Sequence, residues 1–247
     1  MTSTTDRYPG TRLTGALLLS SPLLLIAAAV IVIPAGLTLN PADPAGALAA
    51  VGGRAGLHLT ELALDVLGWL ALTAAGLLLT TLSAPGRGPG AATGGGAGAA
   101  PLPGSEHGPH PAARPGVLPG GLLAAAGLAG LLHDAGNLAL TQLAADPAAP
   151  ASVTTAWAVL LTAKWAVNLA GLLWVSATAA TAALVPMPGR LRLAGAAAAL
   201  SGLVSVVLPW TTGTAAPSPV LEQAGYALHL PVMLWYGVLG LRCLRGR

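Results

Sequence analysis

The sequence predicts an all-α protein, a polytopic membrane helix bundle with six transmembrane helices and both termini in the cytoplasm. Composition is the first observation: of 247 residues, 54% are hydrophobic and only 8% are charged, with a mean hydropathy of +0.74. A soluble domain carries about 25% charged residues. Too few charges remain here to cover a water-exposed surface, so lipid must contact much of the chain. Six apolar segments and the distribution of basic residues between them complete the prediction.

Each apolar segment is close to the roughly 20 residues that a helix needs to cross a bilayer. The predicted spans cover residues 13–37, 60–82, 118–143, 154–180, 191–212 and 220–242. The first segment is interpreted as an uncleaved span and not as a signal peptide. Its apolar run from Ala16 to Gly36 exceeds the roughly 7–15 residues of a signal h-region.

Basic residues predict the orientation of these spans. With six spans, nine of the 11 Lys and Arg residues fall on one side of the membrane, whereas Arg54 falls on the other and Lys164 lies within a span. The nine are Arg7, Arg12, Arg87, Arg114, Arg190, Arg192, Arg242, Arg245 and Arg247. Because Lys and Arg are enriched in cytoplasmic loops, we expect this side to face the cytoplasm. The protein is therefore predicted to be a multi-pass protein of the cell membrane.

One long connection, residues 83–117, separates the N-terminal region (residues 1–82) from the last four spans in 118–247. Gly, Pro and Ala dominate it and no apolar periodicity is present, so it is predicted to be a disordered cytoplasmic linker. His107 and His110 within it offer a weak metal-binding alternative to a plain solvated loop. The single cysteine, Cys243, excludes an intrachain disulfide.

Polar side chains recur at helical spacing in four of the predicted spans. Residues three or four positions apart share a helix face, and a charge at the bilayer centre costs about 2.5–3.5 kcal/mol, so such faces should point into the bundle. These stripes are His58, Glu61 and Asp65; His133, Asp134, Asn137 and Thr141; Lys164 and Asn168; and Glu222, Tyr226 and His229. Glu61 and Glu222 open their spans and are expected in water or among headgroups.

Counting from the turn near Pro150 places Asp134 and Lys164 at the same depth, which predicts that they form an ion pair. The same counting places His229 level with His133. The sequence therefore predicts one outward-facing polar pocket. Its candidate residues are Asp65, His133, Asp134, Asn137, Lys164, Asn168 and His229.

Small and aromatic residues suggest where helices meet. Residues Gly195, Ala198, Ala199 and Gly202 form a small-residue face, which suits close helix packing and offers a surface for homo- or hetero-oligomers. We expect three deep tryptophans to pack between helices, and four other aromatic residues to lie near the membrane interfaces. The first set is Trp69, Trp165 and Trp235, and the second is Trp157, Trp174, Trp210 and Tyr236.

Three short motifs resemble those of an uncharacterised family of bacterial six-span integral membrane proteins. They are Arg12-Leu13-Thr14-Gly15 at the start of the first span, Asp134-Ala135-Gly136-Asn137-Leu138 in the third, and Leu234-Trp235-Tyr236-Gly237 in the last. The resemblance covers most of the chain except the linker. It implies a membrane bundle and no activity.

A small permease-like or sensory protein built around the polar pocket is the favoured function, with no catalytic residue predicted. Several alternatives stay open. His133 and His229 suit the axial ligands of a haem b, and His58, Glu61, Asp65, His133 and His229 suit a metal site in a redox protein or an intramembrane hydrolase. An ion pair that only joins two helices fits a non-catalytic partner or scaffold protein. The sequence contains no basic helix and no group of aromatic residues of the kind that binds nucleic acid, so nucleic-acid binding is not predicted.

Overall fold

The computed structural model describes residues 9–82, 115–147, 149–212 and 218–246. These ranges are helical and contain no strand, which confirms the predicted fold class. The helices are α1 (Pro9–Val32), α2 (Pro44–Gly53), α3 (Ala55–Leu82), α4 (Val117–Leu143), α5 (Pro150–Leu184), α6 (Gly189–Val207), the 3-10 helix η1 (Leu208–Thr212) and α7 (Pro219–Arg245). All but the last three residues of the predicted linker 83–117 lie outside the described residues.

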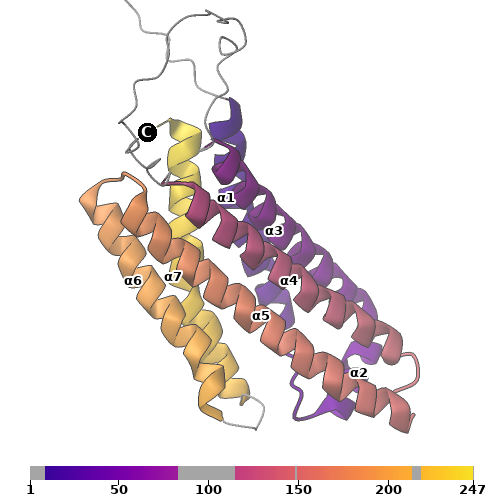
Figure 1. Ribbon diagram of the computed structural model, residues 1–247. Coiled ribbons are helices and arrows are strands. Elements are labelled where there is room, and N and C mark those ends of the chain that lie inside the picture. Colours follow the sequence, from indigo (N-terminus) through magenta and orange to yellow (C-terminus); the bar gives the residue numbers. More distant parts are fainter. Residues whose placement is uncertain (1–8, 83–114, 148, 213–217, 247) are drawn as a thin grey trace, which may run out of the picture.

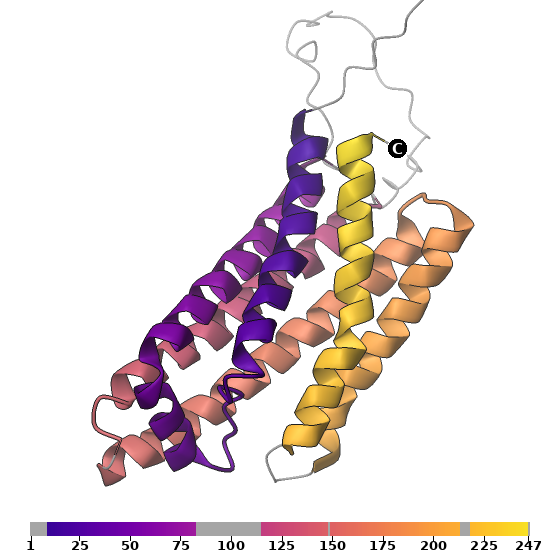
Figure 2. The same ribbon diagram turned by 180° about the vertical axis from the view of Figure 1, so that it is seen from behind.

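Six of the helices, α1 and α3 to α7, are long and apolar enough to cross a membrane, which confirms the number of spans. α1, α3, α4, α5, α6 and α7 each pack against their neighbours in that order, and α7 packs back against α1 (Figure 1). Neighbours in this ring are antiparallel, so α5 and α7 run parallel. Figure 2 shows α7 beside α1 at the end where the chain terminates. We name this the termini end and the opposite one the α2 end; the cytoplasmic position of the termini stays a prediction.

Glycine allows the closest helix contacts. A Cβ atom at Gly240 would lie 2.6 Å from the carbonyl oxygen of Gly15, and one at Gly76 would collide with the amide nitrogen of Ala124. The α1–α7 and α3–α4 pairs therefore pack backbone against backbone, as small residues permit in membranes. On α6, Gly195 faces the Trp235 ring within the same chain. This portion of the small-residue face is filled internally, and the predicted oligomer stays a prediction.

A short helix that was not predicted from the sequence closes the α2 end. α1 ends at Val32, five residues before the predicted end of the first span, because Pro34 disfavours helical geometry at the preceding residue. Gly36 then turns the chain with φ of 63°. α2 begins at an Asp43 cap, whose Oδ1 accepts a hydrogen bond from the Gly46 amide at 2.9 Å. Its fully buried Leu48 belongs to an apolar cluster shared with α4 and α5.

Aromatic side chains fill the interior on the other side of the polar residues. Trp174 of α5 lies at the centre, with its ring centroid 5.8 Å from that of Trp69 on α3 and 6.0 Å from that of Tyr236 on α7. Packing of Trp69 and Trp235 between helices is confirmed. The interfacial placement of Trp174 and Tyr236 is wrong, because they are 0% and 1% exposed. We call Trp69, Trp174 and Tyr236 the aromatic core.

The third tryptophan expected between helices, Trp165, is 39% exposed, so that prediction is also wrong. Successive residues on a helix are turned by about 100°. The face of α5 that points inward carries Lys164 and Trp174, and Trp165 is therefore rotated toward the outside.

Candidate functional site

The polar side chains form two adjoining clusters. The α3–α4 cluster comprises His58, Glu61, Asp65, His133, Asp134 and Asn137. The polar residues of α5 and α7, which we call the α5–α7 cluster, are Lys164, Asn168, Glu222, Tyr226 and His229, of which Lys164 and Glu222 form an ion pair. The seven residues expected in one pocket are thus divided, with four in the first cluster and three in the second. A hydrogen bond from His133 to α5 joins the clusters.

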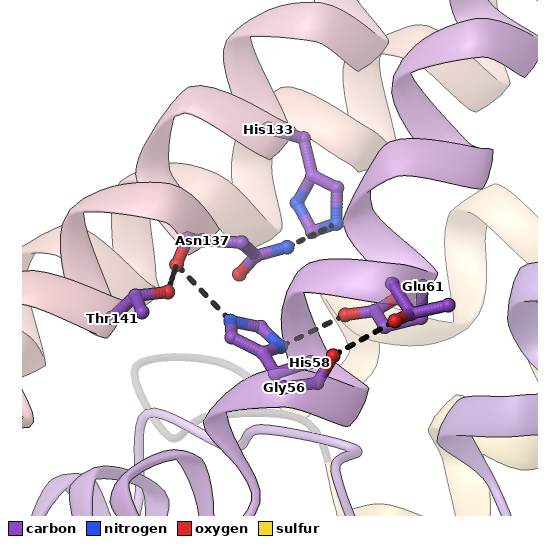
Figure 3. Close-up of polar contacts among 7 residues, drawn as sticks. Gly56, His58, Glu61, His133, Asn137 and Thr141 are labelled. Carbon is purple, nitrogen blue, oxygen red and sulfur yellow. Dashed lines mark hydrogen bonds and ion pairs between the residues drawn. The ribbon is translucent and has the colours of Figure 1, made fainter.

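His58 links the start of α3 to α4. Its Nδ1 lies 2.9 Å from Oε1 of Glu61, one turn along, and its Nε2 lies 3.2 Å from the carbonyl oxygen of Asn137 (Figure 3). His58 is 1% exposed and Glu61 is 6% exposed. The prediction that Glu61 lies in water or headgroups is therefore wrong. α3 starts directly after α2 and packs against α4, so its first turns are already inside the bundle.

His133 is held at both ring nitrogens. Nδ1 lies 2.9 Å from the carbonyl oxygen of Ala163 on α5. Nε2 lies 3.0 Å from the amide nitrogen of Asn137, as Figure 3 shows. A carbonyl oxygen can only accept and an amide NH₂ can only donate. The hydrogen-bond network therefore assigns the proton to Nδ1 and the lone pair to Nε2, a neutral tautomer with a fixed orientation.

Asp65 and Asp134 bring two carboxyl groups to this histidine. One carboxylate oxygen from each and one ring nitrogen of His133 all lie within 4.8 Å of one another. Asp134 is 2% exposed, and its oxygens meet no hydrogen-bonding group except the Asp65 carboxyl group. Two carboxylates at this separation cannot both stay ionised in a low-dielectric interior without a compensating positive charge. The arrangement is suited to hold a proton or a metal cation.

Lys164 pairs with Glu222 on α7, and the predicted ion pair between Lys164 and Asp134 is wrong. The side chains of Lys164 and Glu222 are 15% and 5% exposed. The expectation that Glu222 lies in water or headgroups is therefore wrong as well. The equal depth of Asp134 and Lys164 was predicted correctly, because their chain neighbours His133 and Ala163 are hydrogen-bonded to each other. The directions of the two side chains were not predicted correctly. Lys164 extends toward α7, whereas Asp134 lies beside Asp65 on α3.

α5 and α7 run side by side in one register. Lys164 meets Glu222, and a Cβ atom on Gly171 would lie 3.8 Å from Cε1 of His229, so both pairs are 58 positions apart. His133 contacts Ala163, eight residues before Gly171, which corresponds to about 12 Å along α5. His229 is therefore not level with His133. It packs against the Trp174 ring at a centroid distance of 5.4 Å, and the two histidines do not face a common haem.

Both ends of the α3–α4 cluster are covered. The α2 helix and its apolar contacts lie on one side, and the aromatic core begins at Trp69, one turn beyond Asp65. A groove of about 320 Å³ between α4 and α5 is apolar, being lined by residues such as Leu132 and Val159, and none of the two clusters' side chains line it. Asp134 is buried, whereas Asp65, His133 and Asn137 are partly buried, so the single outward-facing pocket stays a prediction.

Comparisons with family models, curated proteins and solved structures give no match. The function must therefore be argued from the geometry of the two clusters.

Proposed function

We propose that this multi-pass membrane protein is permease-like and that it binds and moves a cation through the α3–α4 cluster. The observation that carries the proposal is Asp134. Its side chain is almost completely buried inside a membrane bundle, and the Asp65 carboxyl group is the hydrogen-bonding group that its oxygens meet. Ionisable residues in the membrane interior are costly and typically mark ion or proton pathways.

A purely structural role would favour carboxyl groups that are already neutralised, as in the α5–α7 cluster. There Lys164 offsets Glu222, and the pair joins two helices. The group that Asp65 and Asp134 form with His133 contains no lysine or arginine. The difference between the clusters supports assigning cation binding to the first and helix attachment to the second.

The covers on either side of the α3–α4 cluster support a gated pathway. Passage toward the α2 end requires displacement of α2, which rests on the buried Leu48. Passage toward the termini end requires the aromatic core to open around Trp174. A site that packs against α2 toward one end of the bundle and against the aromatic core toward the other suits alternating access, in which helix groups move around a fixed site.

Reconstitution into liposomes tests this proposal. Vesicles containing a pH-sensitive or zinc-sensitive dye should report proton or Zn²⁺ movement down an imposed gradient, faster than in vesicles without protein. Asp134→Asn should abolish this movement, whereas Asp146→Asn, at an exposed carboxyl group, should retain it. Equal rates with and without the wild-type protein would refute permeation of these cations.

A further inference from the structure

We infer that Asp65, His133 and Asp134 bind one divalent transition-metal ion of the Zn²⁺ class. Identifying the metal as cargo rests on the proposed function, whereas the metal site itself rests only on the three side chains. Their donor atoms are two carboxylate oxygens and one imidazole nitrogen, and all lie within 4.8 Å of one another.

Charge favours a divalent ion. Two ionised carboxylates and a neutral imidazole carry a net charge of −2, so one divalent ion makes the complex neutral. A monovalent ion would leave an uncompensated negative charge inside the bundle, which is costly where water is excluded. Lys164 does not change this balance, because its own charge is offset by Glu222.

The orientation of His133 is that of a metal ligand. Histidines that bind metals commonly donate the second ring N–H to a carbonyl or carboxylate, which fixes the tautomer and directs the free lone pair at the ion. In this protein Nδ1–H donates to the Ala163 carbonyl oxygen at 2.9 Å. Nε2 then presents its lone pair, which is held by the Asn137 amide at 3.0 Å.

The buried carboxyl group of Asp134 lies within 4.8 Å of one ring nitrogen of His133 and supports the same site. The side chain is 2% exposed, and its oxygens meet no hydrogen-bonding group except the Asp65 carboxyl group. Leaving such a group unsatisfied is unfavourable, and a metal ion between Asp134, Asp65 and His133 would satisfy it. No other group of three His, Cys, Asp or Glu residues in the described ranges lies so close together.

Ligand type selects the metal class. Mixed carboxylate and imidazole ligands suit Zn²⁺ and its neighbours, whereas Ca²⁺ and Mg²⁺ prefer oxygen ligands alone. Tetrahedral Zn²⁺ with bonds of about 2.0–2.2 Å spaces its ligands roughly 3.4 Å apart, so donor atoms that now lie within 4.8 Å must approach one another by up to about 1.4 Å. Three protein ligands leave the fourth position open, which a transported ion needs for exchange.

Zinc binding to the purified full chain, measured by competition with a chromophoric chelator, tests the inference. A His107→Gln/His110→Gln background removes the linker histidines as an alternative site. One Zn²⁺ per chain is expected, with Mg²⁺ unable to displace it. Asp134→Asn and Asp65→Asn should each weaken binding at least about tenfold, whereas the exposed Asp146→Asn should leave it unchanged.

Asn137→Ala provides a variant with the opposite expectation. Because the Asn137 amide must leave Nε2 before a metal can bind, its removal should keep or increase the zinc affinity. A loss greater than tenfold in this variant, an absence of zinc binding, or binding that ignores Asp134→Asn would overturn the site. If an aspartate variant does not fold, the zinc affinity of Asn137→Ala and the zinc stoichiometry of the wild-type protein still test the site.

The flux measurement separates this inference from the proposed function. Zinc binding that depends on Asp134, without any cation movement in liposomes, would keep the metal site and refute permeation. Proton movement that depends on Asp134, without zinc binding, would keep the permease and refute the metal site.

Discussion

Replacement of Lys164 by methionine should destabilise the bundle by leaving Glu222 as a buried, uncompensated charge. Removing one partner of a buried ion pair typically costs 3–5 kcal/mol, and both side chains here are at least 85% buried. For a chain of this size 1 kcal/mol corresponds to about 2–4 °C, so the melting temperature in detergent should fall by roughly 6–20 °C. Thermal unfolding of the purified Lys164→Met protein, followed by circular dichroism, measures this change.

The double variants identify the partner. Lys164→Met with Glu222→Gln removes both charges and leaves side chains of similar size, so most of the lost stability should return. Lys164→Met with Asp134→Asn should not recover it, because Asp134 lies beside Asp65 and not beside Lys164. Recovery with Asp134→Asn and none with Glu222→Gln would refute the assignment of the two clusters.

Two further predictions concern packing. Gly120→Ala should destabilise the protein by about 1–3 kcal/mol, because its Cβ would lie 2.7 Å from the carbonyl oxygen of Gly76. Gly121→Ala has open space around its Cβ and should be neutral or stabilising. Equal melting temperatures of the two variants would contradict the close α3–α4 contact. Leu48→Ala should accelerate hydrogen exchange throughout α2, since the removed side chain is fully buried, and Leu57→Ala, at a 40% exposed position, should not. Unchanged exchange in Leu48→Ala would show that α2 does not rest on this residue.

The six spans were predictable because hydrophobicity and length suffice to identify membrane helices. α2 was not, because ten residues are too short to span and its Asp43–Pro44 start lies among other turn-forming residues. The Asp43 cap followed by proline was nevertheless a readable signal. A search for caps within loops would have found it.

Equal depth of Asp134 and Lys164 was also predictable, since a short turn joins their antiparallel helices. The direction of each side chain was not, because spacing within one helix does not say which neighbour the polar face meets. The polar stripe from Glu222 to His229 was recognised in the sequence. The residues of α5 that it meets, each 58 positions earlier in the chain, depend on how α7 is placed along α5. Tertiary packing alone fixes that offset.

Zinc K-edge X-ray absorption of the wild-type chain loaded with one equivalent of Zn²⁺ tests the central claim most directly. We expect a first shell of nitrogen and oxygen atoms at about 2.0–2.1 Å, including the outer-shell scattering of one imidazole. The imidazole signal should disappear in His133→Gln. A sulfur atom in the first shell, two or more imidazoles, or an imidazole signal that survives His133→Gln would contradict the proposed site.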